Sequence, residues 1–444
     1  MSAFAKIQSS SVFFFYLLLI LLPVQLGRHF WPSDAYVFGI RIDYLSPTFY
    51  LTDFVIFLLL ILWAKELLFG KTKFLKKTFF AIFCFPVALL ISAIVRESWA
   101  TSIYYVAKIF EMSLLSLFVA SKIDFKKQAR IILGFLSVGV FWQSLLAIFQ
   151  FLSQKSLGLW ILGERSFSAQ TPGISLVDLS GGQYLRPYGT FPHPNLLGGF
   201  LAVTIPALLI LLLVQKKKSR LLISALLLGF VALALTFSRT SWLVGFGLSL
   251  LIVIKFVWER GIKASRGSIL TLVGTALVLL FAFPFFVQRV TSFSTTDSHS
   301  LILRLKLTSS ALSMLRGHPL FGVGPDRFLL FLPGFFDLAE TIRWIQPVHN
   351  IFLLVAAEAG IFGLISFIIL FFYPIFELFK RIKKDAFAKI VLLWFLAIYV
   401  LASFDHYFLT LQQGQLIFWI FLGLSWAYLK SERMDKTTSK TVLE

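Results

Sequence analysis

Long apolar runs separated by short polar segments dominate the sequence. About 20 residues of helix cross the hydrocarbon core of a bilayer, and we identify twelve runs of roughly that length or slightly shorter. They cover residues 11–27, 48–68, 78–95, 101–120, 130–153, 192–214, 220–236, 241–257, 268–287, 348–373, 387–404 and 414–429. Because a backbone in lipid must satisfy its own hydrogen bonds, each run is predicted to be a helix. The pattern therefore predicts an all-α, polytopic membrane bundle.

Two of the polar segments, residues 154–191 and 288–347, are longer than a connection between helices requires. Loops of such length are typically functional or disordered. Within the second, residues 301–315 are predicted to form an amphipathic helix on the membrane surface. Its apolar face would comprise Leu301, Leu305, Ala311, Leu312 and Leu315. We expect one membrane domain over 1–429, followed by a polar tail, 430–444.

Composition and charge agree with a membrane protein and give its orientation. The chain is 58% hydrophobic and 14% charged, well below the charged share of soluble domains. Its net charge of +20 does not indicate nucleic-acid binding, because most basic residues lie in alternate short loops. These loops are 65–77, 122–130, 216–220, 255–266, 380–389 and the tail. By the positive-inside rule both termini are predicted to be cytoplasmic, with the two long loops outside and the basic loops against lipid headgroups.

The N-terminal segment bears on signal-peptide cleavage, and the single cysteine bears on disulfides and zinc sites. Lys6 and the first apolar run resemble a signal peptide, but no small-residue cleavage site follows, so an uncleaved first helix is expected. Cys84 lies within a predicted span and has no second cysteine to pair with. An intramolecular disulfide and a cysteine zinc site are therefore excluded.

His349 is the strongest candidate for a catalytic base. It follows Pro347 at the predicted first turn of the tenth span, and Asn350 comes next. A helix N-terminus disfavours a cation, so a histidine there tends to stay neutral and able to accept a proton. The alternative is a capping or interfacial histidine bonded to a backbone carbonyl.

Three arginines are predicted to lie outside although most basic residues lie inside. Arg239 occupies a tight turn between two spans, Arg304 lies on the predicted surface helix, and Arg186 precedes the sixth span. Each could bind a substrate phosphate as a bidentate ligand or contact lipid phosphate. Together they indicate an anionic ligand at the outer face.

The remaining polar residues near these positions have structural explanations. His318 belongs to a turn, and His193 and Asn195 flank Pro194 at a helix start, where they would cap the helix. Glu358 is interpreted as an anchor between helices, since an acid within the membrane requires a partner. Lys108 and Glu111 are expected to pair with each other.

Several chemistries are not supported by the sequence. It has no phosphate-binding Gly-x-x-x-x-Gly-Lys loop and no Gly-x-Ser-x-Gly elbow. No cluster of His, Asp and Glu shows metal-ligand spacing, since the pair Asp405-His406 is too small to form a site. We therefore expect neither a metal nor a cofactor.

The motifs in this region resemble the O-antigen ligase superfamily, which also contains O-antigen polymerases and bacterial O-oligosaccharyltransferases. The resemblance rests on Gly317-His318-Pro319-Leu320-Phe321-Gly322-Val323-Gly324, on His349-Asn350 and on Glu358-x-Gly360-x-x-Gly363-Leu364. Two upstream segments are also similar, namely Arg186 with Pro192-His193-Pro194-Asn195, and Thr236-Phe237-Ser238-Arg239-Thr240. The layout of spans with a large outward loop before the histidine helix is similar as well.

The resemblance implies a reaction and roles. Such enzymes transfer a glycan from a polyprenyl-diphosphate carrier to an acceptor hydroxyl at the outer side of the inner membrane, without nucleotide or metal. His349 would be the catalytic base, Arg239 and Arg304 would hold the diphosphate, and Arg186 would assist. A single displacement would invert the anomeric configuration, because no carboxylate is well placed as a nucleophile.

Other functions remain open at this point. Within the same chemistry, the motifs do not separate a ligase from a polysaccharide polymerase or a protein O-oligosaccharyltransferase. A flippase or transporter of lipid-linked glycans is the alternative from another class. Transporters typically bind substrate near the bilayer midplane, where this chain offers only Lys108, Glu111 and Glu358. The sequence therefore favours an enzyme acting at the membrane surface.

Overall fold

Long helices lie side by side in this chain, and one further helix crosses their ends. The computed structural model describes residues 10–69, 76–179, 182–215, 219–260, 274, 287, 295–335, 345–380 and 386–441. The helices of the first half are α1 (Ser10–Leu21), α2 (Leu51–Phe69), α3 (Lys76–Val95), α4 (Trp99–Lys122), α5 (Phe125–Ser153), α6 (Pro194–Val214), α7 (Arg220–Leu235) and α8 (Arg239–Arg260). Those of the second half are α10 (Thr295–Gly317), α11 (Phe328–Phe331), α13 (Ile351–Phe379), α14 (Ala386–Phe404), α15 (Tyr407–Thr410) and α16 (Gln412–Thr441).

The predicted all-helical architecture is confirmed, with a smaller number of candidate spans. Each predicted span coincides with a described helix except 268–287, which lies almost wholly outside the described residues. Seven of the described helices are long and apolar enough to cross a membrane, namely α3, α4, α5, α6, α8, α13 and α14. Among the others, α1 and α7 are apolar but shorter. The bundle is therefore that of a membrane-embedded protein.

Helix α6 lies at the centre of one half of the bundle. Nearly all of its residues are buried, and it packs against α7, α8 and α14. Full burial suits its sequence, because leucine, isoleucine, valine and alanine line every side of the helix. Its first turn, beginning at Pro194, is consequently held rigidly at the end of the bundle where α10 lies.

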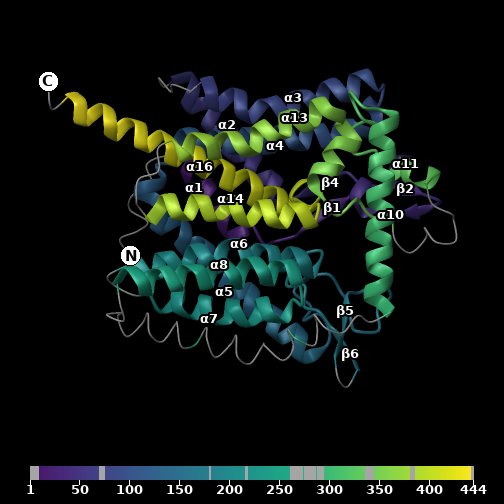
Figure 1. The fold of residues 1–444 in the computed structure, drawn as a ribbon, viewed down its shortest axis with the longest axis horizontal. Coiled ribbons are helices and arrows are strands. Elements are labelled where there is room, and N and C mark those ends of the chain that lie inside the picture. Colours follow the sequence, from purple (N-terminus) through teal and green to yellow (C-terminus); the bar gives the residue numbers. More distant parts are fainter. Residues whose placement is uncertain are drawn as a thin grey trace.

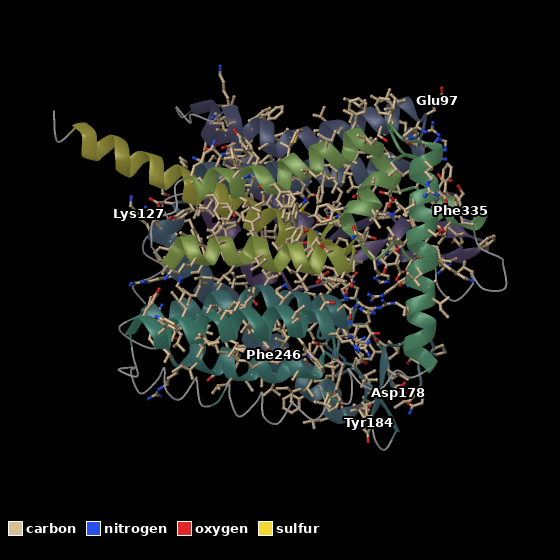
Figure 2. The ribbon with its side chains drawn as sticks, in the orientation of Figure 1. Glu97, Lys127, Asp178, Tyr184, Phe246 and Phe335 are labelled. Atoms are coloured by element: carbon tan, nitrogen blue, oxygen red, sulfur yellow. The ribbon has the colours of Figure 1, made fainter. Side chains whose placement is uncertain are left out.

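Helix α10 crosses one end of the bundle nearly at right angles to the long helices, as Figure 1 shows. The strands lie at this same end, called the α10 end below. They are β1 (Gly27–His29) paired with β4 (Thr48–Tyr50), β2 (Tyr36–Val37) with β3 (Ile40–Arg41), and β5 (Leu176–Leu179) with β6 (Gly182–Leu185), all antiparallel. Figure 2 places Glu97 and Phe335 at the α10 end and Lys127 at the opposite end.

A hydrophobic core joins α10 to the bundle through a face that the sequence did not indicate. Leu307, Ala311 and Met314 of α10 are buried against residues of segment 35–45 and of α13. Of these three residues, Ala311 belongs to the predicted apolar face. Leu301, Leu305 and Leu312 of that predicted face are exposed on the protein, so their contact with the membrane surface stays a prediction. The buried face was not predicted because it packs on segment 27–50, which forms β1 to β4 and is distant in sequence.

Helix α13 is broken one third of the way along its length. Gly360 has φ 66° and ψ −163°, a conformation that residues with a side chain avoid. The turn of residues 318–327 packs into this break. A Cβ atom at Gly360 would collide with the backbone of Leu320, and one at Gly322 would collide with the backbone of Glu358. The two glycines therefore permit direct contact between backbones.

Hydrogen bonds from the turn satisfy the backbone groups that the break leaves open. Val323 N–H donates to Ala357 C=O at 2.9 Å, and Ile361 N–H donates to Pro319 C=O at 2.8 Å. The Glu358 side chain accepts the N–H of Phe328 at 3.2 Å. The turn thus fixes the segment of α13 that precedes Gly360, which begins beside His349.

Candidate functional site

His349 is positioned by the capping residue that follows it. Asn350 is the N-cap of α13, and its Oδ1 accepts the N–H of Leu353 at 2.9 Å. Its Nδ2 donates to the carbonyl of Ser403 at 3.1 Å, which ties the start of α13 to the end of α14. The prediction that His349 lies in the first turn of this helix is therefore wrong, because α13 begins at Ile351 and His349 immediately precedes the N-cap. This tie brings His349 beside the first residues after α14.

Asp405, the first residue after α14, lies beside the ring of His349. Its Oδ1 lies 3.6 Å from His349 Nδ1, and both side chains are largely buried. The same oxygen accepts the N–H of His406 at 2.9 Å, and Oδ2 accepts from Asn195 Nδ2 at 3.1 Å. Burial alone would raise the pKa of Asp405, but His349, with His406 and His193 nearby, holds that pKa below its usual range. Asp405 is therefore a carboxylate that faces the imidazole.

Arg186 is linked to the Asp405 carboxylate through Asn195. Its Nη2 donates to Asn195 Oδ1 at 2.8 Å, and Nε donates to the carbonyl of Thr236 at 2.7 Å. Its Nη1 donates to Ser175 Oγ at 3.0 Å. A chain of hydrogen bonds thus runs from Arg186 through Asn195 to Asp405, which in turn lies beside His349.

A cavity of about 240 Å³ is lined by Asp405 and by all three predicted arginines. Its lining comprises Arg186, Asn195, Phe237, Ser238, Arg239, Thr240, Ser241, Leu301, Arg304, Leu401, Phe404, Asp405 and Tyr407. Arg239 and Arg304 are half-buried there, and Arg186 is buried. Three guanidinium groups against one carboxylate give the cavity a net positive charge, which suits an anion such as a diphosphate.

The structure separates the other predicted residues by location. His193 is the N-cap of α6 and accepts the N–H of Asn195 at 3.1 Å; burial and the charge of Arg186 lower its pKa to about 3. His318 is absent from the lining of the arginine cavity. It lies 3.5 Å from Arg96 at the end of α3, and burial and that arginine lower its pKa. Glu358 holds the turn at the break in α13.

Asp405 was missed as a site residue because the sequence argument considered it only as half of a metal pair. Its position directly after an apolar run could have identified it, since that run must end on the side where the tenth span begins. That no metal binds stays a prediction, although the fold brings a third possible ligand to the pair Asp405–His406. His349, Asp405 and His406 offer ligand atoms that all lie within 4.8 Å of one another. Tertiary packing brings His349 next to Asp405 and His406, and the spacing of these residues in the sequence does not indicate it.

The chemistry of these three side chains fits hydrogen bonding better than a metal site. His406 Nδ1 is bonded to Thr410 Oγ1 at 2.7 Å, and both Asp405 oxygens accept hydrogen bonds. Burial lowers the pKa of His406 to about 3 despite the adjacent carboxylate. His406 therefore serves as a neutral neighbour, and the pair of His349 and Asp405 has the arrangement of a base with its orienting acid.

Comparison with known protein families agrees with these motifs. Residues 224–368 match the family model described as O-antigen ligase. The matched segment includes Arg239, Arg304, His349 and Glu358, while Asp405 lies beyond it. No curated protein matches the chain. The resemblance identified in the motifs is confirmed over this segment.

Proposed function

We propose that the protein is a membrane glycosyltransferase that moves a glycan from a polyprenyl-diphosphate carrier to an acceptor hydroxyl. One observation carries the proposal: the His349–Asp405 pair adjoins a cavity lined by three arginines, and most of these residues lie in the segment that matches the O-antigen ligase family. The pair can accept a proton and the arginines can hold a diphosphate, which are the two tasks of this transfer.

The reaction proceeds as one displacement at the anomeric carbon. The acceptor oxygen attacks that carbon while its proton passes to His349, and the bond from the carbon to the diphosphate oxygen breaks. Charge then grows on the departing diphosphate, where Arg239 and Arg304 neutralise it. Asp405 stabilises the imidazolium that forms. Attack opposite the leaving group inverts the configuration, and no step requires a metal or cofactor.

Arg186 has a different role from the other two arginines. Its guanidinium donates hydrogen bonds to Thr236, Ser175 and Asn195, so its orientation is fixed by the protein. We assign Arg239 and Arg304 to direct diphosphate binding and Arg186 to holding Asn195 while adding positive charge. This assignment refines the sequence-based expectation that Arg186 assists.

The proposed location is the inner membrane, with twelve spans, both termini in the cytoplasm and the arginine cavity on the extracytoplasmic face. The support is the charge distribution along the bundle. Lys127, in the basic segment 122–130 and in the first turn of α5, lies at the end opposite to α10, whereas the arginine cavity includes residues of α10 itself. A basic segment at one end and the cavity at the other are what the positive-inside rule predicts.

The test is transfer by the purified full-length chain, measured as polyprenyl diphosphate released from a lipid-linked glycan donor. His349→Ala should lose about 10²–10⁴-fold in rate, the usual contribution of a general base. His318→Ala is the matched control, since this histidine does not line the arginine cavity. Activity should also persist in excess chelator. Loss of activity in chelator would replace the base mechanism with a metal site at His349, Asp405 and His406.

A further inference from the structure

Another cavity lies at the end of the bundle opposite to α10, and we call it the three-helix cavity. Its volume is about 270 Å³, and its lining comes from the last turns of α6 and α8 and the first turns of α14. The other ends of these same helices line the arginine cavity through Asn195, Arg239 and Leu401. The two cavities therefore occupy opposite ends of one group of packed helices.

The length of these helices places the two cavities at opposite surfaces of the membrane. Helices α6, α8 and α14 contain 21, 22 and 19 residues. At a rise of 1.5 Å per residue each is about 30 Å long, which is the thickness of the hydrocarbon core of a bilayer. A group bound at Arg239 thus lies at one surface, and a lipid in the three-helix cavity has to come from the other leaflet.

Apolar side chains form most of the wall of the three-helix cavity. Leu213 comes from α6, Leu251 and Phe256 come from α8, and Leu393 comes from α14. Leu251 is 60% exposed, so the wall continues onto the outer surface of the bundle, where lipid lies. An apolar recess that is open to the bilayer can be filled by a hydrocarbon chain, which gains dispersion contacts with such a wall.

Three charged side chains line the same cavity. Lys255 and Glu259 are one helical turn apart on α8, and Lys389 lies in the first turn of α14. Lys255 Nζ is 3.8 Å from Glu259 Oε1, and Lys389 Nζ is 3.7 Å from Glu259 Oε2. Among the lining residues that the structure describes, two positive charges therefore face one negative charge.

Glu259 does not engage the N–H donors of either lysine closely. Both separations exceed the distance of about 2.7–2.9 Å that is usual for a hydrogen bond between an ammonium group and a carboxylate. Ion pairs of this kind at a partly exposed position contribute little to stability. One phosphodiester, with a single negative charge, would balance the charges of Lys255, Glu259 and Lys389 and accept hydrogen bonds from both lysines.

We propose that the three-helix cavity binds one anionic phospholipid of the cytoplasmic leaflet. An acyl chain fills the apolar recess, and the phosphodiester lies between Lys255 and Lys389. Basic pockets between transmembrane helices on the cytoplasmic side bind such headgroups in other membrane proteins. The bound lipid contacts α6, α8 and α14 together, at the end opposite to the arginine cavity. The inference uses the proposed orientation of the chain and does not depend on glycan transfer.

The test measures which lipid the purified full-length chain retains in detergent. The protein is mixed with equal amounts of phosphatidylglycerol and phosphatidylcholine that carry the same acyl chains, and the complexes are counted by native mass spectrometry. We expect several-fold more phosphatidylglycerol than phosphatidylcholine, because the choline cation would approach two lysines. Lys255→Gln combined with Lys389→Gln should remove this preference.

A matched control removes two positive charges elsewhere at the same end. Lys127→Gln is combined with Arg130→Gln, since both residues are exposed on α5 and neither lines the three-helix cavity. This pair should retain the preference for phosphatidylglycerol. A loss of equal size in the control would attribute the preference to overall surface charge and overturn the proposed site.

Glu259→Gln gives a prediction of opposite sign. Removing this carboxylate raises the charge at the cavity by one, so the preference for phosphatidylglycerol should increase several-fold. If Lys255, Glu259 and Lys389 serve only to join α8 to α14, this variant should lower the melting temperature and leave the lipid preference unchanged. That result would contradict the inference.

Three further results would also overturn it. The first is equal retention of the two lipids by the unmodified chain, and the second is a preference that survives Lys255→Gln with Lys389→Gln. The third is displacement of phosphatidylglycerol by an uncharged long-chain polyprenol, which would assign the cavity to the prenyl chain of a carrier lipid. No glycan donor is present, so these results decide lipid binding separately from the proposed function, which the rate of His349→Ala tests.

Discussion

Replacing Asp405 by asparagine tests whether the carboxylate acts on His349 or only holds the fold. At the observed 3.6 Å between His349 Nδ1 and Asp405 Oδ1, a charge pair with an effective dielectric constant of about 20 is worth roughly 4 kcal/mol. The imidazolium forms only as the proton is transferred, so this energy stabilises the transition state. Its loss corresponds to a fall in rate of roughly 10³-fold.

The same substitution also creates a hydrogen-bond conflict, which has to be separated from the electrostatic effect. One Asp405 oxygen accepts from Asn195 Nδ2 and the other from the N–H of His406. In either orientation, the new amide group of Asp405→Asn would place a donor against a donor. We expect this to cost about 1–3 kcal/mol of stability, seen as a lower melting temperature in detergent.

A double variant separates the two effects. Asn195→Asp combined with Asp405→Asn exchanges carboxylate and amide, so every hydrogen bond between the two positions can re-form. Arg186, which donates to residue 195, is then paired with a carboxylate. We expect the melting temperature to recover and the transfer rate to stay roughly 10³-fold low. Recovery of the rate together with stability would refute the role assigned to Asp405 and leave it a structural residue.

Three further predictions concern binding, pH and orientation. Arg239→Lys and Arg304→Lys should each lose nearly as much transfer activity as the alanine variants, because lysine cannot bind a diphosphate as a planar fork; full activity in both lysine variants would return these residues to lipid contact. The pKa of His406 falls from its usual value to about 3 on folding, so the unfolded state binds more protons between those values. His406 alone should therefore cost about 1 kcal/mol of stability on acidification from pH 7.5 to 5.5, and His193, whose pKa is also lowered to about 3, should add a similar amount. A melting temperature that does not fall in this range, or that falls equally in His406→Asn, would contradict that account. In a Cys84→Ala background, Leu320→Cys should react with a membrane-impermeant thiol reagent added outside the cell, and labelling only after the inner leaflet is opened would reverse the proposed topology.

The hydrophobic pattern predicted the helices well because each span depends mainly on local sequence. The limits of α3, α4 and α14 lie within two residues of the predicted ones. Segment 27–50 was missed for the opposite reason. Its strands are two or three residues long and are stabilised by contacts with α10 and α13, which are distant in sequence. No local periodicity records such contacts.

The sequence predicted the three arginines of the candidate site, but it did not predict that Asp405 lies beside His349. Arg186, Arg239 and Arg304 were identified because cations in outward loops are unusual, and the structure places all three around one cavity. Asp405 joins them only because Asn350 ties the start of α13 to the end of α14. The closeness of these two chain segments is set by tertiary packing, so it cannot be read from one sequence alone.

The break at Gly360 has a consequence for how the protein enters the membrane. An interrupted helix exposes backbone groups to lipid, and each unsatisfied group costs several kcal/mol there. The turn that satisfies them, residues 318–327, precedes α13 in the chain and is synthesised first. This turn is therefore already present when the interrupted helix emerges from the ribosome. Helix α3, which is synthesised before the turn, contacts it as well, since Ser92 of α3 donates a hydrogen bond to the carbonyl of Phe321 at 2.7 Å. The order of the motifs along the chain thus matches the order in which an interrupted span can be inserted without stranded backbone groups.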